Sequence, residues 1–236
     1  MKQEPSAARP VPVITVDGPG GAGKGTVALR LARHLGWHLL DSGALYRLVA
    51  LAARQQDVAF SDVTGLARLA ADLDVSFELT PERLEPVVLL AGTPVGEALR
   101  SDAAGQGASM VAALPEVRAA LVERQRAFRE PPGLVADGRD MGTVIFPDAE
   151  LKVFLTATPE ERARRRYKQL IDKGLDANLR DLFESIADRD ERDAERAASP
   201  LRPADDAVVL DSTEVDADEV FEQVLAAARA CGLLPD

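Results

Sequence analysis

A glycine-rich segment near the N-terminus limits what this chain can fold into more than any other feature. Residues 18–26 read Gly-Pro-Gly-Gly-Ala-Gly-Lys-Gly-Thr, after the apolar run Val13–Val16 and before the helix-like pattern Lys24–Leu35. A glycine-rich loop between a buried strand and a helix brings backbone N–H groups and the helix N-terminus to one place. Such a place binds phosphate groups, and a lysine in the loop adds positive charge. The sequence therefore predicts a phosphate-binding loop within an α/β fold.

This loop supplies the first candidate binding residues. Lys24 would reach the β- and γ-phosphates of a nucleotide, and a hydroxyl group would hold Mg²⁺. Gly25 stands where serine or threonine usually follows the lysine, and Thr26 comes one position later, so direct ligation of Mg²⁺ by Thr26 is left open. An ordinary glycine-rich turn is the alternative, which the lysine and the flanking elements disfavour. The candidate phosphate-binding residues are Gly18, Gly20, Gly21, Ala22, Gly23, Lys24, Gly25 and Thr26, with Thr26 as the candidate metal ligand.

The rest of the chain alternates strand-like and helix-like segments, which predicts a parallel sheet flanked by helices. Further strands are expected at Trp37–Leu40, Gly133–Ala136, Leu151–Leu155 and Ala207–Leu210. Helices are expected at Ala44–Arg54, Pro115–Arg129 and Asp216–Ala230, and another should begin at the capping pattern Thr158-Pro159-Glu160-Glu161. The stretch Val75–Gly96 differs, because two strand-like runs around a polar turn at 81–83 predict a small β-rich insertion.

Composition narrows the class of protein. The 236 residues, 46% of them hydrophobic, suit one compact domain, with residues 1–12 expected to form a flexible tail. A formal net charge of -11 argues against a general nucleic-acid binder. No apolar run approaches the roughly 20 residues that a membrane span needs. The lone cysteine, Cys231, fits a reducing compartment, so we expect a soluble, cytoplasmic protein.

Two further segments carry polar residues at the predicted ends of strands, where parallel-sheet proteins bind ligands. In Asp41-Ser-Gly-Ala-Leu-Tyr-Arg47, Ser42 and Arg47 could hold an acceptor phosphate; the alternative is a helix cap followed by a surface arginine. In residues 136–142, Ala-Asp-Gly-Arg-Asp-Met-Gly, Asp137, Arg139 and Asp140 suit binding of a nucleobase edge or a metal-bound water. The alternative there is a solvated turn with a local ion pair.

Two charged helical segments follow. Arg162 lies on one helix face with Arg165 or Arg166, which could close over nucleotide phosphates; surface ion pairs with neighbouring glutamates are the alternative. Arg189, Asp193 and Arg196 lie at i, i+4 and i+7, so one helix face would present cation, carboxylate, cation. That face could bind phosphate and a ribose hydroxyl, or it could be an exposed charged helix.

Together these segments resemble the bacterial cytidylate kinases over nearly the whole chain. The Asp-Ser-Gly-Ala-Leu-Tyr-Arg and Asp-Gly-Arg-Asp-Met-Gly segments carry most of this resemblance. It implies a P-loop kinase fold: a single domain over residues 13–236 with a parallel β-sheet core flanked by helices. A small β-containing insertion at about 74–100 would bind the nucleoside monophosphate (the NMP-binding insertion), and a helical lid would lie at about 158–190.

The resemblance also implies residue roles. Its catalytic residues would be Lys24, Arg162, Arg165 and Arg166. Its substrate-binding residues, which add Ser109 and Arg118 to those found above, would be Ser42, Arg47, Ser109, Arg118, Asp137, Arg139, Asp140, Arg189, Asp193 and Arg196. The expected reaction is direct transfer of the γ-phosphoryl group of ATP to CMP or dCMP with Mg²⁺, without a general base.

Alternative functions remain open at this point. One is a P-loop kinase for another acceptor, such as UMP, AMP, dTMP or a small hydroxylated metabolite. The other is a non-catalytic nucleotide switch, although the chain lacks the Asn/Thr-Lys-x-Asp motif that reads guanine. The expected partners are small nucleotides alone, without nucleic acid or membrane, and the expected state is a monomer.

Overall fold

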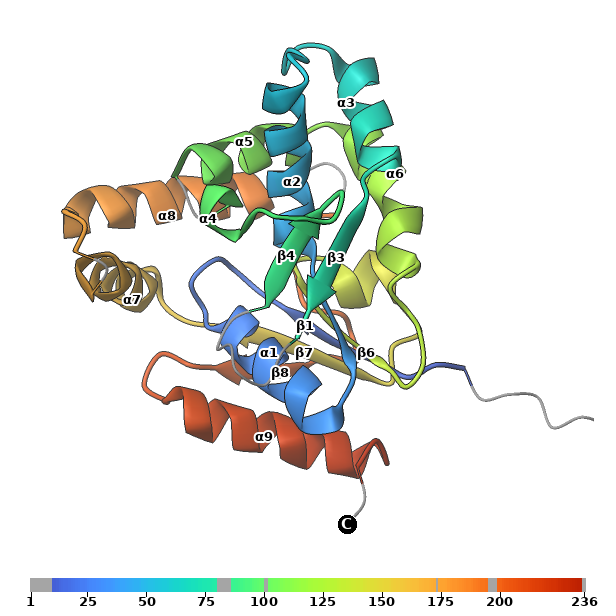
Figure 1. The fold of residues 1–236 in the computed structure, drawn as a ribbon. Coiled ribbons are helices and arrows are strands. Elements are labelled where there is room, and N and C mark those ends of the chain that lie inside the picture. The colour runs from blue at the N-terminus through green and yellow to red at the C-terminus, as the bar shows by residue number, and fades with distance from the viewer. Residues whose placement is uncertain (1–9, 80–85, 100–101, 173, 195–198, 235–236) are drawn as a thin grey trace, which may run out of the picture.

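The computed structural model describes the chain apart from residues 1–9, 80–85, 100–101, 173, 195–198 and 235–236 (Figure 1). Five described strands form a parallel sheet in the order β2-β6-β1-β7-β8. Their bounds are β1 Val13–Asp17, β2 His38–Asp41, β6 Leu134–Gly138, β7 Leu151–Thr156 and β8 Val208–Asp211. The expected α/β class and all five predicted strands are confirmed.

The register of this sheet brings the ends of the strands together. Asp17 of β1 pairs with Gly138 of β6, and Asp41 of β2 pairs with Asp137 of β6. Because the strands are parallel, their carboxyl ends meet at one edge of the sheet. The polar residues that follow these strands therefore gather at the same edge.

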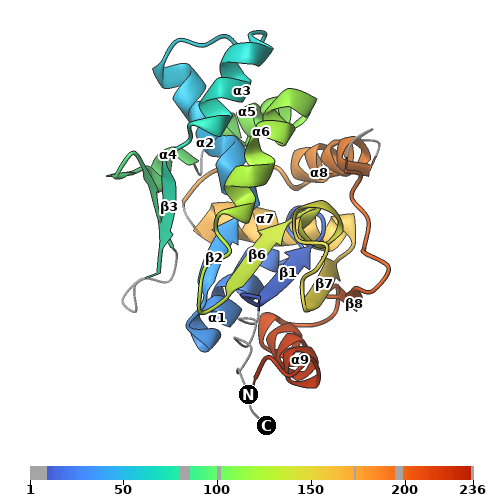
Figure 2. The same cartoon turned by 90° about the vertical axis from the view of Figure 1, so that its right-hand side faces the viewer.

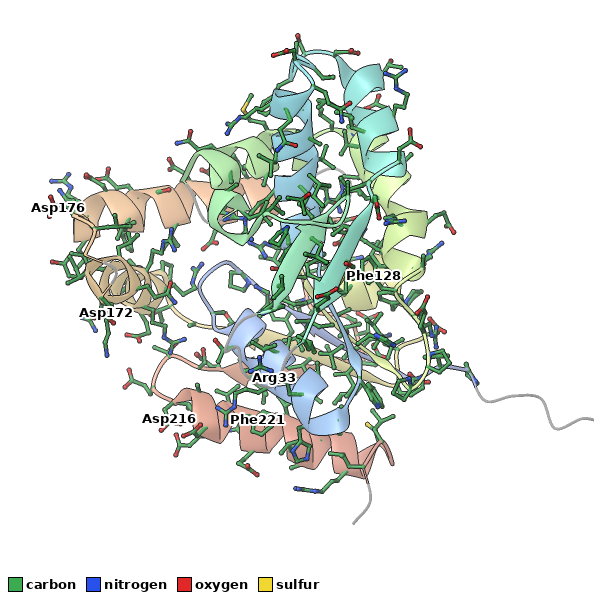
Figure 3. All side chains as sticks on the ribbon, viewed as in Figure 1. Arg33, Phe128, Asp172, Asp176, Asp216 and Phe221 are labelled. Carbon is green, nitrogen blue, oxygen red and sulfur yellow. The ribbon has the colours of Figure 1, made fainter. Side chains whose placement is uncertain are left out.

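Helices cover both faces of the sheet (Figure 2). One face carries α1 Lys24–Leu35 and α9 Ala217–Ala230, and the other carries α2 Ser42–Gln55, α3 Val63–Ala71, α5 Asp102–Ala112 and α6 Pro115–Arg126. Each face has its own apolar core, because alternate residues of β1 point to opposite sides: Val13 into one cluster, Ile14 and Val16 into the other. Phe221 extends from α9 toward α1, where the guanidinium carbon of Arg30 lies 4.3 Å from its ring centre (Figure 3).

A second, antiparallel sheet occupies the segment predicted as a β-rich insertion. It contains β3 Val75–Glu78, β4 Val87–Leu90 and β5 Thr93–Pro94, and the short helix α4 Gly96–Leu99 follows. The polar turn expected at 81–83 lies outside the described residues. Farther along the chain, α7 Pro159–Asp172 and α8 Leu179–Ala194 pack against each other and extend away from the sheet (Figure 1).

Side chains cap the starts of several helices, and one helix ends earlier than expected. Asp41 and Asp216 cap α2 and α9 with their carboxylates, and the Thr158 hydroxyl accepts the Glu161 N–H at 3.3 Å. The helix expected over Pro115–Arg129 ends at Arg126. The N–H groups of residues 128 and 129 bond to carbonyls three residues back, so the last turn tightens, and Pro131 follows.

Across the ranges that the structure describes, none of the helices combines the length and apolarity needed to cross a membrane. Cys231, just after α9, is exposed and has a free thiol.

Candidate active site

The phosphate loop leaves the end of β1 in a shape that glycine permits. Gly18 has φ 144°, and a Cβ placed there would lie 1.9 Å from the carbonyl oxygen of Leu155 in β7. Gly23, which precedes α1, has φ 96°. Both backbone conformations lie in a region that other residues rarely adopt, so these two glycines are required by the path of the loop.

Lys24 lies beneath this loop with its ammonium group buried. Its Nζ donates a hydrogen bond to the carbonyl oxygen of Pro19 at 3.0 Å and lies 3.8 Å from a carboxylate oxygen of Asp137. Burial lowers the pKa of Lys24 to about 8 and raises the pKa of Asp137 to about 6, while the charge of each favours ionisation of the other. The pair therefore places a cation in the loop and a carboxylate at the end of β6.

The carboxylate of Asp137 also lies close to Gly25 of the loop. A Cβ at Gly25 would lie 3.3 Å from the second carboxylate oxygen of Asp137. Thr26 comes next, on the exposed first turn of α1. Among the described residues, no group of three or more His, Cys, Asp or Glu side chains could hold a metal by itself. One carboxylate and one hydroxyl beside a nucleotide suit Mg²⁺, which is commonly held by few protein ligands together with phosphates.

Two arginines and the aspartate that pairs with them lie next to the phosphate loop. Asp193 of α8 is 1% exposed, and its carboxylate accepts a hydrogen bond from Arg139 Nε at 2.7 Å and lies 4.0 Å from Arg189 Nε. The ends of both guanidinium groups approach Gly20, because a Cβ there would lie 3.3 Å from Arg139 Nη2 and 3.9 Å from Arg189 Nη1. The exposed-helix alternative is therefore wrong for Asp193. Arg196, the third member of the predicted face, lies outside the described residues.

A second ion pair joins α6 to the turn after β6. Arg118 bonds to the carboxylate of Asp140, and both side chains are largely buried. The guanidinium of Arg118 also lies 5.9 Å from the ring centre of Tyr46 in α2. This arrangement brings together a carboxylate, a cation and an aromatic ring from three elements, groups of the kinds that bind a nucleobase edge.

The start of α2 lies beside this group. Ser42 is buried, and a Cβ at Gly138 would lie 2.6 Å from its hydroxyl oxygen. Arg47 is half-buried, with Nη1 3.9 Å from an oxygen of Asp41. Asp41 takes the capping role, since its carboxylate accepts the Ala44 N–H at 3.0 Å. Ser109 is half-buried on α5, which packs against α2.

The arginines of α7 divide according to their partners. Arg162 is 2% exposed; its Nη1 donates to the carbonyl of Gly20 at 3.2 Å, and its guanidinium forms a two-pronged bond with Asp190 of α8. Arg165 pairs with Glu161 at 3.0 Å and bonds to Ser212, whose hydroxyl in turn donates to the carbonyl of Ala22 at 3.0 Å. Two of the predicted catalytic arginines are therefore linked to the phosphate loop.

The remaining arginines of this stretch differ from one another. Arg166 is half-buried on the same helix. Arg164 is 72% exposed and lies 4.0 Å from Glu161, so the surface ion-pair interpretation holds for this residue.

Comparison with known proteins decides the family. The sequence model of the cytidylate kinase family matches residues 14–230 of this chain. A cytidylate kinase of Stutzerimonas stutzeri is 59% identical over 218 residues, covering 92% of this chain and 95% of the relative. Another, from Pseudomonas syringae pv. tomato, is 60% identical over 215 residues, covering 91% and 94% respectively. The chain belongs to the cytidylate kinase family.

A solved structure supports the fold of this family member. An uncharacterized protein from Eubacterium ventriosum superposes with a TM-score of 0.52, at 12% identity, over 93% of this chain and 99% of its own. At that identity the match concerns the fold alone.

In this cytidylate kinase family member, three further residues contact the candidate site. Nothing in the sequence singled them out as site residues. Asp190 and Ser212 are the partners that connect Arg162 and Arg165 to other elements. Asp17, at the end of β1, is buried and accepts hydrogen bonds from the turn after β6. A carboxylate that ends an apolar strand was the one available signal for Asp17; Asp190 and Ser212 stand among many similar residues.

Proposed function

We propose that this chain transfers the γ-phosphoryl group of ATP to CMP or dCMP, giving ADP and CDP or dCDP. The observation that carries the proposal is the position of two ion pairs at one edge of the sheet, in a member of the cytidylate kinase family. Lys24 and Asp137 lie at the phosphate loop, and Arg118 and Asp140 lie at the neighbouring turn after β6. The first pair suits the donor phosphates and the second suits a cytosine base.

Transfer needs alignment and charge stabilisation more than proton chemistry. The acceptor phosphate is already anionic, so no general base is required. Lys24 would bind the donor phosphates, and Arg162, Arg165 and Arg166 would stabilise the charge that spreads over the transferred group. Arg47 and Ser42 would hold the acceptor phosphate in line with the donor.

Magnesium enters the proposal through two side chains. Asp137 would bind a Mg²⁺-bound water, and Thr26 would lie beside it on the first turn of α1. When bound with ATP, Mg²⁺ neutralises charge on the β- and γ-phosphates. The closeness of Asp137 to Lys24 in the phosphate loop supports this role.

Base selection rests on Asp140. Cytosine presents an amino donor that a carboxylate can accept, whereas uracil presents a carbonyl at the same place. Repulsion between two acceptors in a buried site disfavours UMP. The bond from Arg118 supports this role, because it fixes the orientation of the largely buried Asp140 carboxylate.

The parts of the chain would act together. The NMP-binding insertion at about 74–100 and the lid at about 158–190 would close over both nucleotides and exclude water from the transfer.

The other two proposals are that the protein is a monomer and that it is located in the cytoplasm. A net charge of -11 supports small nucleotides, bound by local arginines, rather than nucleic acid as ligands.

The decisive experiment measures ADP formation from ATP and Mg²⁺ with CMP, dCMP, UMP, AMP and dTMP offered separately. Strong turnover with CMP and dCMP, weak turnover with UMP and none with AMP would support the proposal down to the base. Preferred turnover with another acceptor would retain the kinase and reject Asp140 as the base reader. Tight ATP binding without turnover on any acceptor would reject the kinase.

A further inference from the structure

Asp17 is a buried carboxylate that the proposed mechanism does not use. It is the last residue of β1 and is 5% exposed. One of its carboxylate oxygens accepts the backbone N–H of Met141 at 2.9 Å, and the other accepts the N–H of Gly142 at 2.8 Å. Both oxygens are thus committed to the backbone of a segment 124 and 125 residues later in the chain.

These N–H groups belong to the turn that carries Asp140, the candidate base reader. Arg139 and Asp140 directly precede them, and Met141–Ile145 forms a single π-helical turn, η1. Asp140 stands at the N-cap of η1, but its side chain makes no capping bond and pairs with Arg118 instead. Asp17 therefore supplies from β1 the oxygen acceptors for the first two N–H groups of this turn.

Packing fixes the same turn from a second direction. A Cβ at Gly142 would lie 2.8 Å from the hydroxyl oxygen of Thr15 and 3.1 Å from the side chain of Lys152. The backbone here consequently lies close against β1 and β7, at the distance that the carboxylate of Asp17 needs. The residue after Asp17, Gly18, lies close against the backbone carbonyl of Leu155, which limits its position as well.

We propose that Asp17 is a positioning residue for base recognition, holding the backbone of Met141 and Gly142 so that the preceding Asp140 faces the cytosine. This inference rests on the proposed function. Asp17 itself touches neither nucleotide, because both of its oxygens are used within the protein. Its burial is costly for a carboxylate: it raises the pKa of Asp17 to about 7, an effect that the two backbone hydrogen bonds and the nearby Lys24 oppose.

The test compares two carboxylates that each accept two backbone N–H groups. Asp17→Asn keeps the shape of the side chain but turns one acceptor into a donor, so one of the two bonds is lost. At about pH 8, above the raised pKa of Asp17, we expect kcat/KM for CMP to fall roughly tenfold or more and the CMP-to-UMP preference to collapse. The KM for ATP should stay within about twofold, because the phosphate loop is retained.

The matched control is Asp216→Asn. Asp216 accepts two backbone N–H groups at the start of α9, at 2.8 and 2.9 Å, both on one carboxylate oxygen, so Asp216→Asn removes the charge but retains an acceptor for both. This variant should leave the CMP-to-UMP preference unchanged. A double variant adds a second check: combined with Asp140→Asn, Asp17→Asn should cause no further loss of preference, since Asp17 acts through the turn that carries Asp140.

An unchanged CMP-to-UMP preference in folded Asp17→Asn, or equal losses toward CMP, UMP and ATP, would overturn the inference. If Asp17→Asn does not fold, Asp17→Glu takes its place in the same assay, because it keeps the charge and shifts the carboxylate by one methylene. A retained preference in that variant would likewise reject the positioning role. A wild-type protein that does not phosphorylate CMP would reject the proposed function itself, which separates the two failures.

Discussion

Lys24 is a buried cation in the loop that is proposed to bind the donor phosphates. Lys24→Met removes the charge and retains most of the apolar length of the side chain. We expect kcat to fall on the order of 10²–10³-fold, because a preorganised cation at the transferring group is lost. Thermal unfolding followed by circular dichroism should show that the fold is retained.

The control for this substitution is Arg164→Met on α7. Arg164 is 72% exposed and belongs to no candidate site, so its removal should leave turnover nearly unchanged. Substantial residual activity in Lys24→Met would contradict the role given to the loop lysine.

Asp140 allows a prediction about selectivity rather than rate. Asp140→Ala removes the proposed acceptor for the cytosine amino group and the carboxylate partner of Arg118. The ratio of kcat/KM for CMP over UMP should fall by roughly tenfold or more, because the repulsion that disfavours UMP is removed together with the attraction for CMP. Competition assays with both monophosphates measure the ratio directly. An unchanged ratio would show that another residue reads the base.

The raised pKa of Asp17 predicts how stability depends on pH. In the unfolded chain this carboxyl should titrate near its ordinary value of 3.8, whereas burial raises its pKa to about 7 in the folded protein. Between these values the folded state binds more protons than the unfolded state, so the Asp17 contribution to the free energy of unfolding falls as pH rises through this window. The slope can reach about 1.4 kcal/mol per pH unit.

Urea unfolding of the wild type and Asp17→Asn at several pH values between about 4 and 8 tests this linkage. The difference in the free energy of unfolding, wild type minus variant, should decrease as pH rises and then level off above about 7. Lys24 and Asp140, whose charges act on the pKa of Asp17, also change their titration in the variant, whereas titrating groups that do not interact with Asp17 cancel in the difference. Parallel stability curves would contradict the prediction.

At the scale of elements, the α7–α8 hairpin is joined to the phosphate loop through Arg162 and Asp190. Asp190→Ala leaves the buried guanidinium of Arg162 without its anion. Because Asp190 is 26% exposed, we expect a loss of about 2–3 kcal/mol in the free energy of unfolding, somewhat less than for a fully buried pair.

Glu184→Ala on the same hairpin is the matched control for Asp190→Ala. It breaks an i,i+4 pair with Arg180 whose two side chains are 59% and 85% exposed. This control should change the free energy of unfolding by less than about 0.5 kcal/mol. Urea denaturation compares the two variants, and equal losses would show that the link to the phosphate loop adds no stability.

Local patterns predicted most of the elements correctly because their causes are local. The capping threonine at 158, the proline at 159 and the apolar periods of α1 and α9 act within one or two turns. Turn η1 was not predicted, since its start is fixed by Asp17, which lies in a distant strand. Helical spacing also could not separate Arg165 from Arg166, because the contact that distinguishes Arg165 comes from Ser212.

Prediction of the site residues was also limited by contacts between distant parts of the chain. The phosphate loop and the segments after β2 and β6 could be recognised because strand ends of a parallel sheet must meet. Ser109 and Arg118 came from family resemblance alone. Which face of α5 or α6 points inward depends on how these helices pack, and that packing is long-range.

At the scale of the whole molecule, the α7–α8 hairpin lies next to the phosphate loop, and its far end, with Asp172 and Asp176, extends outward (Figure 3). If the lid and the insertion close as proposed, CMP together with a non-hydrolysable ATP analogue should reduce the radius of gyration in small-angle X-ray scattering. Each nucleotide alone should produce a smaller change. Superimposable scattering curves for the free and doubly bound protein would contradict closure.

The tight contact at Gly18 has a consequence for laboratory evolution of this loop. A side chain at Gly18 would meet the backbone of β7, which no companion mutation of a side chain can move, whereas one at Gly20 would meet the flexible end of Arg139. A randomised library should therefore return glycine at position 18 under any selection that requires a folded protein. Position 20 should accept alanine or serine once Arg139 is shortened. Redesign of donor specificity can therefore substitute position 20 of the loop but not position 18, where the loop leaves β1.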